Sequence, residues 1–486
     1  MEHFYLILTS SLLIADLMIR IGLSFRVVMR KLEPSITLAW LVVILVFPFA
    51  GAVIYLLFGE NRLGDQRARR AAANLPYLLS WTRSLEKKGL RDWRGINPAC
   101  SILDRHIRSV YGLPTMPDNH LELIDHAGSL FRALIQDINS ARCSCFLQFY
   151  IWHEGGDSDL VADALIRAAS RGVVCRILLD SIGSKKFLKS WQARKMREAG
   201  IEIVEALPAG ILRTLFVRID LRNHRKLVII DSSIAYTGSQ NLVDPRYFKQ
   251  EEQVGQWMDT MVRLQGDLIE ILTAAFIYDW TLETGMTIEE FSADLCLVHR
   301  KSSGKAPIQL VPSGPGFSED SIHDLLLTTI YFARRELILT TPYFVPDSAI
   351  LAALKSAARR GVRVILIVPE KVDSRLVHYA SKARFEELSR AGVEIRLFTR
   401  GLLHSKTITV DSEFCLFGSV NLDIRSFRLN FELTLFIYDR EFTCRLRALQ
   451  QQYLQGTRPL DQEEHARRPV VERFLENAAL LVSPLL

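Results

Sequence analysis

The sequence predicts an α/β protein made of two duplicated α/β/α sandwich domains with a site between them, preceded by an N-terminal transmembrane helical hairpin. Three observations predict this architecture. A short polar signature occurs twice with the same tail, strand and helix patterns alternate around both copies, and residues 36–58 carry no formal charge. At 486 residues, the chain is long enough for two domains beyond the hairpin.

Residues 1–60 are predicted to form the hairpin, with spans at about 4–25 and 36–58. The second span matches the ~20 apolar residues that cross the hydrocarbon core. In the first, Asp16 and Arg20 stand one helical turn apart and could pair, which would lower the cost of charge in lipid. Two buried core helices of a soluble protein are the alternative. We expect no cleaved signal peptide, because the start lacks a basic region and a cleavage site.

Basic residues flank the second span on both sides, with Arg30 and Lys31 before it and Arg67 and Arg69 after it. The positive-inside rule therefore supports either orientation of the spans. An even number of spans would put the N-terminus and the catalytic body on one side of a multi-pass protein. We place that side in the cytoplasm.

Beyond the hairpin we expect a basic, helix-prone connector at 61–120, a first catalytic half at 121–300 and a second half at 301–486. Turn-rich stretches at 114–119 and 302–316 mark the two junctions. The net charge of +6 favours anionic partners, lipid or nucleic acid, without choosing between them. The seven cysteines include no CxxC pair, so they indicate no zinc site.

The two halves repeat one order of elements. Helices are predicted at 129–141 and 321–333, then at 159–170 and 348–359, where each of the second pair ends on an Arg-Gly step. Buried strands follow at 173–179 and 362–368. Alternating strands and helices are typical of a sheet covered on both faces. A duplication of this length predicts two similar domains that share one active site.

The repeated signature is HxKx4D, followed a few residues later by GSxN. The first copy contains His224, Lys226 and Asp231, and the second contains His404, Lys406 and Asp411. A single match is weak evidence, but two matches with the same tail are strong. We interpret them as two half-sites that face each other.

Phosphodiester transfer is the chemistry that needs such a pair. One histidine can attack phosphorus, a second can protonate the departing oxygen, and lysines can hold the non-bridging oxygens. We expect strands at 224–230 and 404–410, on which His and Lys of each copy project from one face. Ordinary core strands with stray polar residues are the alternative, which would have to place His and Lys on one face twice.

The other signature residues have supporting roles in this interpretation. Asp231 and Asp411 fall at the strand ends, so we assign them to turns although they belong to the catalytic signature. The GSxN tails offer side chains that can donate hydrogen bonds to a phosphate, and satisfying a tight turn is their alternative role. These side chains are Ser239, Asn241, Ser419 and Asn421.

Two further segments bear on the membrane. The first half has an insertion at 209–223 that mixes apolar residues with arginines, which suits either an anionic lipid surface or a surface hairpin with a buried face. The apolar tail at 474–486 follows Arg467-Arg468. It fits either a segment resting on the membrane or a helix packed on the second half.

The doubled signature resembles the phospholipase D superfamily, and the whole chain is similar to bacterial cardiolipin synthases of the two-domain, membrane-anchored type. The stretches that carry the closer resemblance are 222–226, 235–239, 243–250, 255–257, 341–346 and 401–404. The resemblance runs from the N-terminal hairpin to the last four residues.

The resemblance implies a phosphatidyltransferase of the bacterial inner membrane that needs no metal or other cofactor. One histidine would be covalently phosphorylated by a phosphatidyl group, and the other would act as general acid and then base. In relatives the nucleophile is often the histidine of the first copy, here His224. The acceptor would be a second phosphatidylglycerol, giving cardiolipin and glycerol. The partners would be phospholipid and the bilayer, with no nucleic acid expected.

The resemblance also implies an acidic residue behind each histidine that orients its ring. Glu432 is the candidate in the second half, and Asp259 is its counterpart in the first half. Two other functions stay open. Water could take the covalent intermediate, as in a phospholipase D or a membrane-tethered nuclease. A lipid-binding scaffold is disfavoured because both histidines and both lysines are present. The sequence does not indicate an oligomeric state.

Overall fold

The computed structural model describes residues 1–31, 34–47, 49–60, 64–208, 218, 220–293, 295, 304–317 and 320–481. The chain forms two compact units. The first comprises Met1–Ala68 with Ala209–Leu221, and the second comprises Arg69–Pro208 with Arg222–Leu486. The predicted insertion at 209–223 lies mostly outside the described residues, as do parts of the 302–316 junction and of the 474–486 tail.

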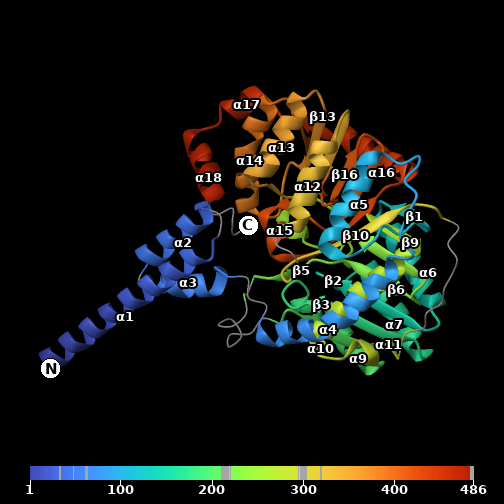
Figure 1. Ribbon diagram of the computed structural model, residues 1–486, viewed down its shortest axis with the longest axis horizontal. Coiled ribbons are helices and arrows are strands. Elements are labelled where there is room, and N and C mark those ends of the chain that lie inside the picture. Colours follow the sequence, from blue (N-terminus) through green and yellow to red (C-terminus); the bar gives the residue numbers. More distant parts are fainter. Residues whose placement is uncertain are drawn as a thin grey trace. The chain divides into compact units, whose positions relative to one another are not determined.

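The first unit contains helices α1 (Glu2–Met29), α2 (Pro34–Val46) and α3 (Ala50–Phe58) (Figure 1). Residues His3–Met29 of α1 form an apolar helix long enough to cross a membrane. The Asp16–Arg20 pair predicted from the sequence forms, with 2.6 Å between Arg20 Nε and an Asp16 carboxylate oxygen. The segment of the first predicted span forms one helix, and its crossing of a membrane stays a prediction.

The second predicted span, 36–58, is not one continuous helix, and that prediction was wrong. The helix is interrupted between α2 and α3. The sequence places Pro48 there, a residue without a backbone donor. Phe49 takes a positive φ of 49°, and its amide donates to Asp16 of α1 at 3.0 Å. A Cβ added to Gly51 would lie 2.2 Å from the Val43 carbonyl oxygen. Only glycine allows this close approach between the two helices.

The second unit begins with most of α4 (Asp65–Leu85) and with α5 (Pro98–Tyr111), which form the helical part of the predicted connector. Arg70 of α4 donates to the carbonyls of Leu282 and Glu283 at 2.7 and 2.6 Å. These carbonyls belong to the last turn of α10 (Leu268–Thr284) and would otherwise lack partners. The connector is thereby fastened to the central helix of the unit.

The first half is a seven-stranded sheet in the order β1-β9-β7-β6-β2-β3-β4. Strands β2, β3 and β4 run parallel, and the rest of the sheet is antiparallel. Its strands are β1 (Asn119–Ile124), β2 (Ser144–Phe149), β3 (Val174–Asp180), β4 (Glu202–Ala206), β6 (Leu227–Ile230), β7 (Ile234–Gly238) and β9 (Met261–Gly266). The predicted helices appear as α6 (Ala127–Ser140) and α7 (Asp157–Ser170), and α8 (Lys185–Leu188), α9 (Trp191–Glu198) and α11 (Ile288–Ser292) complete this half.

The second half repeats this order as β10-β19-β17-β16-β11-β13-β14-β20, with β11, β13 and β14 parallel. Its strands are β10 (Ile308–Ser313), β11 (Glu336–Thr340), β13 (Arg363–Pro369), β14 (Glu394–Phe398), β16 (Thr407–Val410), β17 (Phe414–Gly418), β19 (Asn430–Ile437) and β20 (Thr457–Pro459). Its helices are α12 (Ser321–Phe332), α13 (Ser348–Arg359), α14 (Arg375–Arg390), α15 (Ile424–Arg428), α16 (Arg440–Gln455), α17 (Gln462–Ala466) and α18 (Val470–Leu481). The predicted duplication is confirmed, and the two halves adjoin in Figure 1.

One of the apolar clusters joins the halves. One buried cluster holds Leu227 and Ile229 of the first sheet together with Ile338 and Leu435 of the second. Helix α10 contributes Phe276, which is completely buried and stacks on Phe146 with ring centroids 5.2 Å apart. Because the halves share this core, their relative position is fixed by packing, which can hold a site between them to the accuracy that catalysis requires.

Candidate active site

Both signature histidines lie just before a strand. The predicted strands at 224–230 and 404–410 begin three residues late, because β6 starts at Leu227 and β16 starts at Thr407. His224 follows the two-residue strand β5 (Arg222–Asn223), and His404 follows β15 (Leu402–Leu403). The prediction that His and Lys share the face of a strand was therefore wrong. They lie in a short stretch between two strands.

The two short strands pair with the opposite half. β5 runs beside the start of β19 in the second half, and β15 runs beside β8 (Trp257–Met258) in the first. At the end of each pair, a histidine amide donates to a carbonyl of the other half. His224 N lies 2.9 Å from Phe431 O, and His404 N lies 2.8 Å from Met258 O. The arrangement has approximate twofold symmetry.

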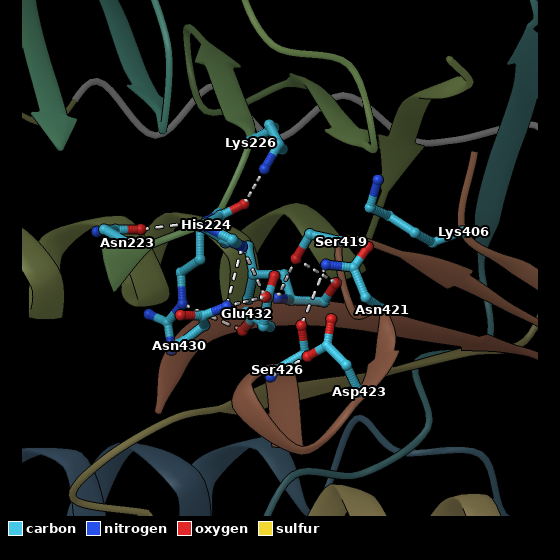
Figure 2. Close-up of polar contacts among 12 residues, drawn as sticks. Asn223, His224, Lys226, Lys406, Ser419, Asn421, Asp423, Ser426, Asn430 and Glu432 are labelled. Carbon is cyan, nitrogen blue, oxygen red and sulfur yellow. Dashed lines mark hydrogen bonds and ion pairs between the residues drawn. The ribbon is translucent and has the colours of Figure 1, made fainter. Parts of the chain in front are cut away.

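This exchange of strands brings each histidine to a carboxylate of the opposite half. His224 Nδ1 lies 3.1 Å from Glu432 Oε1, and His404 Nδ1 lies 2.7 Å from Asp259 Oδ1 (Figure 2 shows the first pair). The acidic residues are those expected from the resemblance, but each supports the histidine of the other half. A proton on Nδ1 donated to the carboxylate leaves Nε2 available for chemistry.

The neighbours of the two rings differ. The amide of Asn430 lies 3.1 Å from Nδ1 of His224, and the ring of Tyr150 lies 4.3 Å from the ring of His224. His404 instead rests against Trp257, with ring centroids 4.4 Å apart. The site is thus symmetric in its histidines and carboxylates, and asymmetric in the side chains that cover them.

Both lysines are buried and donate to the carbonyl of their own histidine, Lys226 to His224 and Lys406 to His404. Burial lowers the pKa of Lys226 to about 8 and that of Lys406 to about 7. Glu432 and Asp259 oppose this effect on both lysines, and the two ammonium groups repel each other. Charges from both halves therefore act on one another in a single site.

Burial also acts on the imidazoles. It lowers the pKa of His404 to about 4 and lowers the pKa of His224 as well, although the carboxylates oppose the shift. Lys226 of the first half contributes to the lowering at His404. Both shifts favour the neutral form of the rings near pH 7. A phosphate anion bound between them would favour the protonated form of a ring, which a general acid needs.

The aspartates of the signature lie at the other end of strands β6 and β16. Asp231 accepts hydrogen bonds from the amides of residues 142–144 at 2.8–3.2 Å. Asp411 accepts from the amides of residues 334–336 at 2.7–2.9 Å. Both have positive φ, 50° and 54°. The interpretation as turn and support residues fits these contacts, which join the turn to the start of the neighbouring antiparallel strand, β2 or β11.

The serines of the shared tails are occupied within the protein. Ser239 donates to Asp259 at 2.6 Å and accepts from the amide of Thr260 at 3.0 Å. Ser419 accepts from the amide of Leu433 at 3.0 Å. Each serine therefore braces the segment that carries a carboxylate, and Ser239 also holds the carboxylate that orients His404.

The asparagines of the tails are buried beside the serines. Asn241 accepts from the amide of Ile151 at 3.1 Å. Asn421 donates to Ser426 at 3.2 Å, as Figure 2 shows. The side-chain oxygen of Asn421 has no hydrogen-bond partner among the described residues. Direct contact of the tail residues with a phosphate stays a prediction.

Sequence reasoning missed a polar network beside His404. Lys249 of the first half contacts Asp373 of the second half at 3.1 Å, and the Tyr343 hydroxyl donates to the same carboxylate at 2.6 Å. The Lys249 ammonium also lies 5.6 Å from the centroid of Trp257, the ring that covers His404. The aromatic corner at 342–344 was the available signal, but its polar partners are distant in sequence.

Comparison with known proteins places these observations in a family. The family described as "Cardiolipin synthase, PLD-like domain" matches residues 134–280 and 326–453, and "Phospholipase_D-nuclease N-terminal" matches residues 20–60. The chain is 42% identical to cardiolipin synthase A of Klebsiella pneumoniae (strain 342) over 100% of both chains. The chain belongs to the cardiolipin synthase family. The same identity and coverage hold for cardiolipin synthase A of Escherichia fergusonii.

A solved structure shows the same fold at low sequence identity. Phosphatidylserine synthase of Haemophilus influenzae Rd KW20 aligns with a TM-score of 0.59 at 16% identity, covering 79% of this chain and 100% of that one. The predicted phospholipase D-like fold and family are confirmed.

Proposed function

We propose that this chain is a cardiolipin synthase that transfers a phosphatidyl group from one phosphatidylglycerol to a second, giving cardiolipin and glycerol. The observation that carries the proposal is the crossed pair of His–carboxylate contacts with two buried lysines beside them. Membership of the family and the identity to cardiolipin synthase A along the whole chain support the same activity.

In the first step, the two lysines hold the non-bridging oxygens of the donor phosphate. Nε2 of His224 attacks phosphorus while His404 gives a proton to the departing glycerol oxygen. A P–N bond forms, a P–O bond breaks, and free glycerol leaves. We assign His224 as the nucleophile by resemblance to relatives. Asp259 stabilises the protonated ring of His404 before the proton is given up.

In the second step, His404 takes the proton from a glycerol hydroxyl of the acceptor phosphatidylglycerol. The resulting oxygen attacks phosphorus, the P–N bond to His224 breaks, and cardiolipin leaves. Glu432 holds the ring of His224 in one tautomer throughout, so that Nε2 can form and release the bond. Water in place of the acceptor would give phosphatidic acid.

We propose that the enzyme lies in the bacterial inner membrane with its catalytic unit on the cytoplasmic side. Helix α1 is the membrane span, and Arg26, Arg30 and Lys31 at its C-terminal end favour the cytoplasm by the positive-inside rule. The break between α2 and α3 favours a bent hairpin over a second crossing, so we do not retain a multi-pass topology. Reporter fusions after residue 31 and at the C-terminus test the orientation, because a periplasmic readout from either would refute it.

The activity is tested by incubating the purified full-length chain with phosphatidylglycerol in vesicles and analysing the lipid products. We expect cardiolipin and glycerol in equal amounts. His224→Ala and His404→Ala should each abolish turnover, whereas His126→Ala is the matched control because that side chain is 76% exposed. Phosphatidic acid as the main product would mean that the chain is a hydrolase and not a transferase. Unchanged turnover in either histidine variant would refute the assignment of the active site.

A further inference from the structure

Helix α18 presents a row of large apolar side chains to solvent. Single exposed apolar residues are common, but a row along one face of a helix marks an interaction surface. The exposed members, with their exposed fractions, are Val470 (80%), Val471 (70%), Phe474 (68%) and Leu481 (79%). The spacing of residues 470, 471, 474 and 481 places these side chains on one side of the helix.

The opposite face of α18 is fixed to the second half. Ala479 is buried against Val345 and Ala380, and Glu472 pairs with Lys382 of α14 at 3.1 Å. Glu476 is buried and pairs with Arg468 at 3.3 Å. The helix is therefore docked by one face, and its apolar row is the other face.

This docked helix lies at the catalytic edge of the half. Val345 belongs to β12 (Phe344–Val345), which pairs with β18 (Leu422–Asp423), and Val345 lies opposite Asp423. The signature residue Asn421 directly precedes β18, and Figure 2 shows Asn421 and Asp423 next to each other. A surface that contacts α18 is thus held close to the end of the half where the chemistry occurs.

The charges around the row suit an anionic surface. Arg473 is exposed on α18 itself, and the two acidic residues of the helix are paired with Lys382 and Arg468. Just before the helix, the side chain of Arg467 is 81% exposed and pairs with the equally exposed Glu463 at 3.2 Å. Apolar side chains flanked by arginines are the pattern of helices that lie in the interface of anionic bilayers. Helix α1 has the length and composition to bring the chain to such a bilayer.

We propose that α18 is an interfacial helix, which lays Val470, Val471 and Phe474 into an anionic phospholipid bilayer and holds the catalytic edge of the second half against it. The membrane anchor would then tether the enzyme, while α18 would orient it. This inference concerns binding and does not depend on which histidine reacts or on whether water or lipid is the acceptor.

The test is a depth measurement on the full-length chain in vesicles that contain phosphatidylglycerol. An environment-sensitive dye is attached at Phe474→Cys in a Cys444→Ser background, because Cys444 is the exposed free cysteine among the described residues. Tyr331→Cys is the matched control, an aromatic position of the same half that is 52% exposed and lies near the opposite end of the sheet, before β11. The parent without an added cysteine shows the background labelling.

Lipids brominated along their acyl chains should quench the dye at position 474 and leave the dye at 331 unaffected. The same quenching is expected in a His224→Ala background, which separates this proposal from the catalytic one. Equal quenching at both positions, or none at 474, would overturn the proposal. Disulfide-linked dimers of the Phe474→Cys variant without quenching would also overturn it, and would indicate that a second copy of the chain covers the helix.

A second readout is activity on two forms of the substrate. Replacing Val471 and Phe474 by serine should lower turnover of phosphatidylglycerol in vesicles by about tenfold, since these side chains supply much of the interfacial contact. Turnover in detergent micelles should stay unchanged, because the lipid is then delivered without a bilayer. Equal loss in both forms would mean a damaged fold, and no loss in vesicles would refute the role of the helix.

Discussion

Replacing Asp259 by asparagine tests the crossed arrangement most sharply among single substitutions. Asp259 is buried, lies 2.7 Å from Nδ1 of His404 and is held by Ser239. His404 carries a positive charge only while it holds the transferred proton, so the carboxylate acts mainly at that stage. A hydrogen bond to a charged group contributes about 1.5–3 kcal/mol, and ~1.36 kcal/mol is tenfold in rate, so kcat should fall about 10- to 150-fold.

The assay is release of glycerol from phosphatidylglycerol under saturating substrate, with folding checked by thermal unfolding. Asp125→Asn is the control, because this carboxylate is partly exposed and contacts His126, whose side chain is largely exposed. Glu432→Gln should also slow turnover, but less, because its contact to His224 is longer at 3.1 Å. A folded Asp259→Asn enzyme within about twofold of the parent would refute the reasoning, since it would place the carboxylate contact below ~0.5 kcal/mol.

The pairing itself can be measured by a double-mutant cycle on unfolding: Asp259→Asn and His404→Ala should be coupled by about 0.5–3 kcal/mol, whereas Asp259→Asn and His224→Ala should be nearly additive. The reverse result would contradict the exchange of carboxylates between halves. The pH profile of kcat/KM should fall more steeply above about pH 7–8 than below it, because the ammonium groups of Lys406 and Lys226, with pKa values of about 7 and 8, lose their protons in the free enzyme. A rate still rising at pH ~9 would contradict the role of the lysines. Asp411→Ala should lower the free energy of unfolding by about 1–3 kcal/mol, because the amides of residues 334–336 lose their acceptor, while kcat of the folded fraction changes little. A large loss of kcat without loss of stability would mean that Asp411 takes part in the reaction itself.

The repeat in the sequence predicted most of the fold. Buried strands of four to seven residues and helices with one apolar face follow from local patterns, so α7, α13, β3 and β13 appear within one or two residues of their predicted bounds. The doubled signature predicted that two histidines would act together. In each case the information lies within a short stretch of chain.

The parts that the sequence did not reveal depend on contacts between distant segments. Strands β5 and β15 are two residues long and pair across the halves, so no local pattern could show that Glu432 meets His224 and Asp259 meets His404. The break in the second apolar segment was missed for a different reason. The uncharged run has the length of a span, but Pro48 within it lacks the backbone donor that a continuous helix needs.

The central claim is that two imidazoles from the two halves act on one phosphorus atom, one as nucleophile and one as acid. A phosphatidyl ester of p-nitrophenol tests it directly, because this leaving group departs without a proton. His404→Ala should release a burst of one nitrophenolate per chain and retain the phosphatidyl group on His224, located by peptide mass spectrometry, whereas His224→Ala should show no burst. A burst from His224→Ala alone would mean that His404 is the nucleophile and His224 the acid. An adduct on any residue other than these histidines would contradict the account.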